Sequence, residues 1–281
     1  MIDNLRRQLL LGVPILAGGM AMADAAGKSP AATRPESVFK GPRETLHALA
    51  KVLGSMDGSL CYHWLGGRIF DKRDAAPLAE PMLDWEGCTI RRFAWEGPDR
   101  LRMTYRGIIL FKAVDGPVID EFRSPASGGT KPVAHFRTAL GAYTFTSTGI
   151  EASPRFKGRL GTNPNPFTLP WITAGDDVWL TLDERVEYTR PGTTTVIADN
   201  AVFRYQSRLS EIADASLAMA SANASYHSEI PYYDWMGMAG VDGHTLWGAA
   251  GKKYARLDSL PERFVAAVTR RYPTHFSDPL A

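Results

Sequence analysis

The stretch Arg100-Leu101-Arg102-Met103-Thr104-Tyr105-Arg106 decides the fold class, because polar and apolar side chains alternate along it without a break. Successive side chains of a β-strand point to opposite faces, so Leu101, Met103 and Tyr105 face one side and the arginines the other. This alternation predicts a half-buried antiparallel strand with a solvated arginine face.

Several segments around this stretch share its two-residue period. Residues 60–65 and 88–95 alternate before it, and further strands are expected at 108–114, 118–122, 133–138, 142–148, 178–189 and 194–207. No crossover helix fits between the early strands, which excludes a doubly wound parallel sheet. The pattern predicts a mainly β fold, either an antiparallel strongly curved sheet or a calycin-like barrel, with short helices at the N- and C-terminal ends.

Two helices are expected to flank the strands. Pro42 opens the first, which ends at Gly54 and buries a stripe of Leu46, Leu49, Ala50 and Leu53. Near the C-terminus, Ser259 and Glu262 form an S-x-x-E capping box ahead of a stripe of Phe264, Val265 and Val268. Between them, residues 153–174 are expected to form a long loop across the sheet mouth, and residues 211–222 a short helix.

The N-terminus has the organisation of an export signal. Arg6 and Arg7 precede an apolar run, and small residues of the A-x-A form follow at 21–23 and 23–25. The run contains Pro14 and is short for a spanning helix of about 20 residues. We predict a twin-arginine-like signal peptide at 1–26, a linker at 27–41 and a single β-rich domain at 42–281. This implies a periplasmic location, the twin-arginine export machinery as a partner, and no stable membrane span after cleavage.

Composition limits the partners of the protein. The 32 basic and 30 acidic residues give a net charge of +2. A nucleic-acid surface gathers Lys and Arg on one face, so no nucleic-acid partner is expected. The hydrophobic content of 44% is that of a globular protein with a core.

Cys61 and Cys88 are the two cysteines, and each lies in a predicted strand. In an oxidising compartment they pair only if their Cα atoms lie within about 7 Å of each other. Otherwise they are two buried thiols, and the sequence leaves both alternatives open.

The segment from Glu229 to Tyr254 concentrates the residues expected of a site. It holds two tryptophans, three tyrosines, two aspartates and a histidine among five glycines, and matches neither a strand nor a helix pattern. Such residues suit the wall of a pocket, and equally a loop that plugs one end of a β structure.

One interpretation of this segment is an acid–base set. Desolvation beside Trp235 would raise the pKa of Asp234, a carboxylate would hold His244 in one tautomer, and Tyr232 would stabilise a developing anion. Alternatively, Asp234 caps a turn and His244 donates to a backbone carbonyl. The candidate catalytic residues are Asp234, His244 and Tyr232.

Arg92 is the most informative single position, because it interrupts the face formed by Cys88, Ile90 and Ala94. A buried arginine requires an anionic partner. Either Glu86 or Asp234 supplies a structural ion pair, or the carboxylate or phenolate of a ligand does so. The candidate ligand-binding residues are Arg92, Trp235, Trp247, Tyr105 and His135.

The sequence lacks the common catalytic and cofactor motifs H-E-x-x-H, C-x-x-C, G-x-x-x-x-G-K-[ST], G-x-G-x-x-G and G-x-S-x-G. Its six histidines, at 47, 63, 135, 227, 244 and 275, show no metal-ligand spacing on one element. We therefore predict neither a metal nor a cofactor.

A set of short motifs is similar to those of one known family. They are Leu-Gly-Ser-Met-Asp-Gly at 53–58, Tyr-His-Trp-Leu-Gly-Gly-Arg-Ile-Phe at 62–70, Glu-Gly-Cys-Thr-Ile-Arg-Arg at 86–92, and the stretches 235–238, 246–252 and 260–262. Over residues 42–278 the chain resembles the family called domain of unknown function 1838. The resemblance implies a single exported domain and no established reaction. Residues 115–117 and 124–129 depart from the family's turns, so a pocket function of relatives is expected to be altered here.

Three classes of function fit these observations. The first is an exported, cofactor-free protein that binds a small apolar or aromatic molecule in a β-walled pocket. The second is a cofactor-independent lyase, isomerase or hydratase that transfers a proton on such a molecule. The third is an envelope accessory protein without a small-molecule site, which predicts an exposed apolar patch instead of buried, pKa-shifted groups.

Overall fold

A computed structural model of the chain describes residues 38–138, 140–146, 150–152, 171–189, 196–277 and 280. The predicted signal peptide at 1–26, most of the linker at 27–41 and positions 153–170 of the predicted loop lie outside these residues. Within the described part, no helix has the length and apolar character needed to cross a bilayer.

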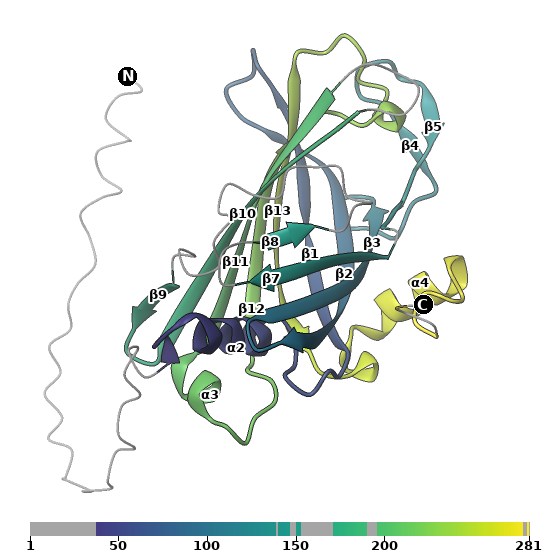
Figure 1. Cartoon of the computed structure of the whole chain (residues 1–281). Helices are drawn as coiled ribbons and strands as arrows, with labels where there is room; N and C mark the ends of the chain where they lie inside the picture. The colour runs from purple at the N-terminus through teal and green to yellow at the C-terminus, as the bar shows by residue number, and fades with distance from the viewer. Residues whose placement is uncertain are drawn as a thin grey trace, which may run out of the picture. The chain divides into compact units, whose positions relative to one another are not determined.

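Antiparallel strands make up most of the described chain (Figure 1). The longer strands are β1 (Cys61–Arg73), β2 (Glu80–Gly97), β3 (Arg100–Lys112), β7 (Gly141–Thr146), β10 (Asp177–Thr189), β11 (Val196–Arg208), β12 (Asn223–Ile230) and β13 (Gly243–Tyr254). The shorter strands are β4 (Glu121–Arg123), β5 (Thr130–Pro132), β6 (Phe136–Arg137), β8 (Ile150–Ala152) and β9 (Trp171–Ala174). One sheet runs in the order β8-β7-β3-β2-β1-β13-β12-β11-β10-β9 with β6 beside β3, and β4 and β5 form a separate pair.

The predicted mainly β, antiparallel class is therefore confirmed. Among the described strands, the hydrogen-bonded path of the large sheet has two ends, β8 and β9. The finer prediction of a strongly curved sheet or calycin-like barrel is not confirmed by this path.

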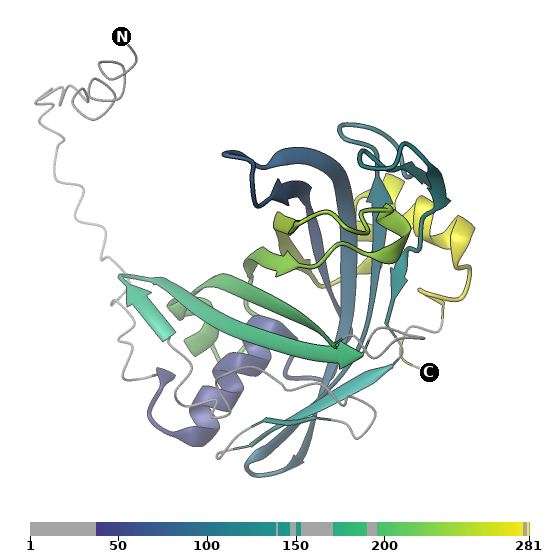
Figure 2. The same cartoon turned by 90° about the horizontal axis from the view of Figure 1, so that it is seen from above.

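Two helices pack on opposite faces of the sheet (Figure 2). Helix α2 (Pro42–Leu53) packs on Leu101 and Met103, and helix α4 (Glu262–Arg271) packs on Cys88 and Ile90. We call these surfaces the α2 face and the α4 face. Odd-numbered residues of β1, β2, β3, β11 and β13 point to the α2 face over most of each strand.

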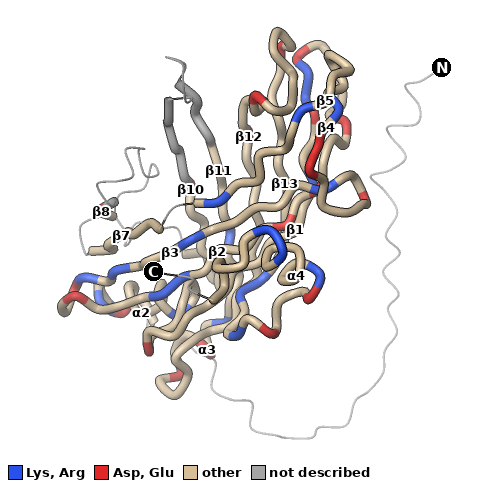
Figure 3. The backbone as a smooth tube through the Cα atoms, turned by 90° about the vertical axis from the view of Figure 1, so that its right-hand side faces the viewer, with Lys and Arg blue, Asp and Glu red and all other residues tan. Residues whose placement is uncertain are grey.

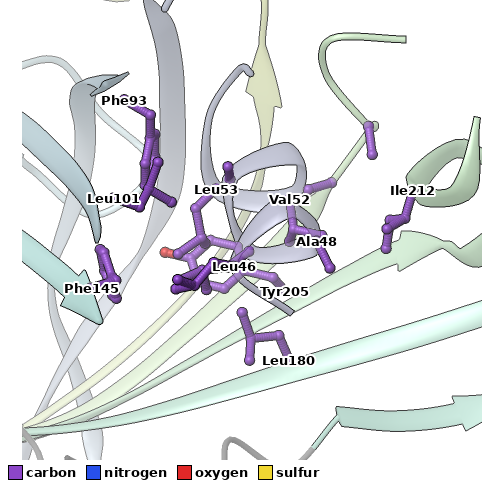
Figure 4. Packing of buried hydrophobic residues seen from close by; sticks show 14 of the residues in the cluster. Leu46, Ala48, Val52, Leu53, Phe93, Leu101, Phe145, Leu180, Tyr205 and Ile212 are labelled. Carbon is purple, nitrogen blue, oxygen red and sulfur yellow. The ribbon is translucent and has the colours of Figure 1, made fainter. Parts of the chain in front are cut away.

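Helix α2 starts at Pro42 and ends at Leu53, as its sequence predicts. Its burial exceeds the predicted stripe, since Thr45 and every residue from Ala48 to Leu53 are also buried. Leu46 and Leu53 lie among side chains of β2, β3, β7 and β10, including Phe93, Leu101, Phe145 and Leu180 (Figure 4). Each such apolar side chain contributes about 1.5–3 kcal/mol by its burial, so α2 is a major part of the core.

Helix α4 buries Phe264 and Val268, as predicted. The predicted capping box is wrong, because no side chain caps the helix and Pro261 occupies the N-cap position. Ser259 ends the short helix η2 (Leu257–Ser259) instead. Its hydroxyl donates to Asp258, 3.4 Å away.

Charged residues of both signs are interspersed along the described backbone (Figure 3). On the α4 face, the buried carboxylate of Glu86 lies 3.0 Å from both Lys112 and Arg263. Arg100 and Arg102 of the predicted arginine row are exposed and pair with Glu151 and Glu96. These two arginines therefore lie on the solvated surface that the alternation predicts, whereas Arg106 of the same row is only partly exposed.

Three segment predictions are corrected by the structure. The helix expected at 211–222 shortens to α3 (Leu209–Ala213), and residues 171–174 form a strand, β9, rather than the end of a loop. Residues 243–254 form strand β13, paired with β1 along its whole length. Glycines at 248 and 251 conceal the two-residue period there, because a glycine has no side chain to mark either face.

The two cysteines are buried free thiols. Cys61 lies on the α2 face, where its Sγ is 3.5 Å from the carbonyl oxygen of Leu53. Cys88 packs on the α4 face with Phe264. Their placement on opposite faces explains why the two thiols remain separate.

Candidate functional site

Three predicted ligand-binding residues come together around Phe111 of β3. The ring centroids of Trp235 and Trp247 lie 5.0 and 5.8 Å from that of Phe111, and the His135 ring lies 6.1 Å away. The three aromatic residues among these belong to an aromatic cluster on the α2 face, which consists of Trp85, Phe111, Tyr226, Tyr233, Trp235 and Trp247. His135 lies at the edge of this cluster. Offset and edge-on rings at these distances stabilise one another beyond their burial.

His135 has a structural contact in this cluster. Its Nδ1 accepts a hydrogen bond from the backbone N–H of Phe111 at 3.2 Å, which leaves the proton of the neutral ring on Nε2. Burial and the charge of Arg271 lower the pKa of His135. His135 is therefore a neutral ring that holds the backbone of β3.

The predicted position of Arg92 on a buried face is wrong, because its side chain is exposed, as is that of Ala94. Cys88 and Ile90 share this face but lie under α4, whose cover does not extend to Arg92. The arginine that points to the α2 face is its neighbour Arg91. It is only partly exposed, and its Nη2 donates to the hydroxyl of Tyr205 at 3.0 Å.

The candidate catalytic residues occupy different surroundings. Asp234 is exposed at the start of helix η1 (Asp234–Met236), and its backbone carbonyl accepts a bond from Lys131. His244 lies opposite Lys72 on β1 and points to the face opposite Trp247. Tyr232 is buried and donates to the Asp71 carboxylate at 2.5 Å.

The bond from Tyr232 to Asp71 fastens the segment after β12 to the end of β1. Asp71 is buried and also pairs with Arg73 at 2.9 Å. Burial, and then the hydrogen bond to Asp71, raise the pKa of Tyr232. Tyr232 therefore remains a neutral phenol that donates its proton to a carboxylate.

The α2 face is divided between two buried clusters. One surrounds α2 and the other is the aromatic cluster with its apolar neighbours, and Leu65 and Phe203 touch both. Between the clusters, side chains that point to the α2 face are only partly exposed rather than buried. We call five of them the central band: Leu65, Thr89, Tyr105, Ile109 and Phe203.

Small residues lower the surface of the sheet at the central band. Reading across the sheet, Ile109 pairs with Gly87, Gly87 with Leu65, Leu65 with Gly251, and Gly251 with Ala224. Three of these five positions are glycine or alanine, so the row rises little above the backbone. Tyr105, a predicted ligand-binding residue, closes one end of the band by stacking on Tyr143 at 5.0 Å.

A group of basic side chains adjoins the band at its α2 end. The basic cluster consists of His63, Arg91 and Lys253, with Tyr205 beside them. Lys253 donates to the carbonyl oxygens of Lys51 and Gly54, and His63 Nε2 to that of Leu53 at 2.8 Å. These three carbonyls belong to the C-terminal end of α2, where backbone acceptors lack helical partners.

The basic groups of this cluster depress one another's protonation. Burial, then the charges of Arg91 and Lys253, hold the pKa of His63 well below its usual value. Burial is the main cause that lowers the pKa of Lys253 to about 7, and Arg91 adds to it. Both shifts report mainly the removal of these groups from water beneath α2, and the charge of Arg91 adds to each.

A hollow lies on the α4 face, away from all predicted site residues. It is an open groove of about 950 Å³ lined by residues near the start of β1, by η2 and by α4, among them Leu60, Tyr62, Leu257 and Val265. The groups with depressed pKa values in the basic cluster lie on the other face. We therefore place the candidate site at the central band, not in this groove.

Sequence reasoning did not single out Arg91, His63 and Lys253 as one group. The alternation assigns Arg91 and Arg92 to opposite faces, but it does not say which face a helix covers. His63 and Lys253 are directly opposite each other across β1 and β13. Only the recognition of 243–254 as a strand would have placed them together.

The fold and site together define a mainly β protein in which one large antiparallel sheet carries a partly exposed band beside a basic cluster. The chain belongs to the family described as protein of unknown function (DUF1838), whose model matches residues 57–280. The predicted family is thus confirmed. No curated protein matches the chain.

Proposed function

We propose that this protein is exported and binds a small apolar or aromatic molecule at the central band. The observation that carries the proposal is the break between the two core clusters of the α2 face, where Leu65, Ile109 and Phe203 are partly exposed. Apolar side chains in that position gain free energy when a ligand removes them from water, about 25 cal/mol per Å².

In this proposal the sheet supplies a calycin-like, β-walled pocket. The aromatic cluster bounds it on one side and α2 on the other. A few polar groups are placed among apolar ones, namely Thr89 and the hydroxyls of Tyr105 and Tyr143, which lie 3.2 Å apart. Mostly apolar walls with few polar groups are typical of small-molecule sites.

Binding is favoured over catalysis by the placement of the candidate catalytic residues. Asp234 is exposed, Tyr232 donates to Asp71, and His244 points to the opposite face from Trp247. Proton transfer requires an acid and a base within reach of one substrate. An accessory protein would present a continuous apolar patch. Among the described residues, the large exposed apolar side chains come from strands β6, β9 and β11 and from segments between elements: Leu78, Val114, Phe136, Ile172, Val202 and Leu217.

Export is proposed from the sequence of residues 1–26. Replacing the Arg6-Arg7 pair by two lysines is expected to leave the protein in the cytoplasm as an uncleaved precursor, because the twin-arginine route reads the arginines as an address. Fractionation of cells with an antibody against the C-terminal domain measures this. Unchanged delivery to the periplasm would contradict the proposal.

The first test of binding is native mass spectrometry on the mature protein purified from its own compartment, followed by denaturation and identification of what is released. An apolar or aromatic molecule in stoichiometric amount is the expected result. A released metal would contradict the cofactor-free proposal, and a mass equal to that of the bare chain would contradict binding.

A matched pair of variants tests the location. Thr89→Phe fills the band from β2, whereas Thr104→Phe adds the same volume on the α4 face of β3; both threonines are partly exposed. We expect Thr89→Phe to abolish co-purification of the ligand and Thr104→Phe to preserve it. Circular dichroism confirms the fold of both. Equal retention of ligand would place the site elsewhere.

A further inference from the structure

We propose that Arg91 is the anchor for a carboxylate, so that the ligand is an apolar or aromatic acid whose charged group lies at the α2 end of the central band. This inference rests on the proposed function, because it assigns a chemical class to the molecule that the band holds.

The position of Arg91 connects the basic cluster to the band. On β2 it lies two residues from Thr89 and points to the same face. Its cross-strand neighbours are Tyr105 of the band on β3 and Cys61 on β1. A ligand that lies along β2 from Arg91 to Gly87 spans about 13 Å and meets Leu65 and Ile109, the cross-strand neighbours of Gly87.

The geometry of Arg91 suits a planar oxyanion. Its guanidinium carbon lies 5.7 Å from the centre of the Tyr205 ring, and Nη2 donates to the Tyr205 hydroxyl. Guanidinium groups held in one plane by such contacts match the two oxygens of a carboxylate. The Tyr205 ring also packs edge-on to His63 at 5.6 Å, which holds the platform in place.

The electrostatics of the cluster favour an anion. Lys253 is buried and donates to two backbone carbonyls. Arg91 and Lys253 both act to lower the pKa of the buried His63. Arg91 carries a positive charge on this face, and a carboxylate placed beside a guanidinium in a partly buried position lowers the energy of both groups.

A single-charge acid fits better than a phosphate ester. Arg91 lies next to the band on β2, and Lys253 and His63 lie further under α2, where they donate to its carbonyls. A doubly charged group next to Leu65 and Ile109 would have one guanidinium to offset its desolvation. The chemistry therefore favours one carboxylate attached to an apolar body.

Two pairs of probes test the inference, each pairing an acid with a neutral analogue of similar shape: 2-naphthoate with 2-naphthamide, and dodecanoate with dodecanol. Dissociation constants are measured by calorimetry on the mature protein freed of endogenous ligand. We expect the acid of at least one pair to bind about tenfold more tightly than its neutral analogue.

Arg91→Met is expected to remove this preference while the neutral analogue still binds. Arg92→Met provides the matched control, because it removes the same charge one residue away on the opposite face and is expected to keep the preference. Arg91→Lys separates loss of charge from loss of fold. It retains the charge and is expected to retain part of the preference for the acid.

The outcomes separate the two proposals. Equal binding of acid and neutral analogue by the wild-type protein overturns the role of Arg91 and leaves the binding site standing. A preference that survives in Arg91→Met, or that is lost equally in Arg92→Met, also overturns it. The absence of saturable binding for all four probes, together with a ligand-free native mass, removes the proposed function and this inference with it.

Discussion

At the scale of single residues, the end of α2 is held by side chains from distant strands. His63 and Lys253 donate to carbonyls of Lys51, Leu53 and Gly54, which a helix leaves without backbone partners. A cation or donor at a helix C-terminus also interacts favourably with the helix dipole. The basic cluster thus serves the core whether or not it also meets a ligand.

The burial of His63 makes stability depend on pH. Its pKa is held well below the ordinary value of 6.5 by burial and by the charges of Arg91 and Lys253. As pH falls below 6.5, the unfolded chain takes up the proton first, so the folded state loses stability. Between pH 6.5 and 5.0, protonation of His63 in the unfolded chain lowers the free energy of unfolding by up to about 2 kcal/mol.

The variant His63→Gln is expected to lose less stability than the wild-type protein between pH 7.5 and pH 5.0. Urea unfolding of both proteins at the two pH values measures the difference. Burial and two nearby arginines lower the pKa of His275 to about 4. His275 contributes equally to the pH dependence of both proteins, so its contribution cancels in the comparison. Parallel pH profiles would show that His63 is not the group responsible.

The alternation along β1, β2 and β3 predicts which residues share a face, and the structure agrees for Leu101, Met103 and Tyr105. It does not predict how far a helix covers that face. Arg92 illustrates this, because its burial depends on where α4 ends, which is a property of packing between distant parts of the chain. The same limit applies to the candidate site, because the alternation places Arg91 and Arg92 on opposite faces but does not show that Arg92 is exposed and Arg91 partly buried.

At the scale of elements, β13 shows how glycine hides a strand. Its residues facing α2 are Gly243, Thr245, Trp247, Ala249, Gly251 and Lys253, a series too mixed in size to read as one face. The register with β1 requires these small residues. A β-carbon added at Gly251 would collide with the carbonyl oxygen of Trp64, and one added at Gly67 with that of Gly248.

Gly251→Ala is therefore expected to destabilise the protein by about 3 kcal/mol or more, because the clash involves backbone that cannot rotate away. Gly248→Ala is the control on the same strand, since an added β-carbon there meets nothing within 4 Å. Its effect should stay within about 0.5 kcal/mol. Thermal and urea unfolding of both variants measure the contrast, and equal losses would contradict the close approach of β1 and β13.

At the scale of the whole molecule, the sheet separates two cores of unequal strength. On one face, α2 is buried on nearly all sides and is held by His63 and Lys253. On the other face, α4 buries only Phe264 and Val268, and its ion pair from Arg263 to Glu86 involves an exposed arginine. Exposed pairs of this kind add little to stability, so the α4 face is expected to open before the α2 face.

The two cysteines report on these openings separately, because Cys61 lies beneath α2 and Cys88 beneath α4. Burial raises the pKa of both thiols, so neither reacts until its cover is removed. The rate of modification by an alkylthiosulfonate reagent is measured in single-cysteine variants under mild urea. We expect Cys88 to react about tenfold faster than Cys61. This ratio means that the free energy of opening the α4 face is about 1.4 kcal/mol lower than that of opening the α2 face. Rates measured on the fully unfolded variants correct for intrinsic reactivity. If the corrected rates are equal and follow global unfolding, the sheet and both helices open as one cooperative unit. If Cys61 is modified faster, the α4 face has the stronger core.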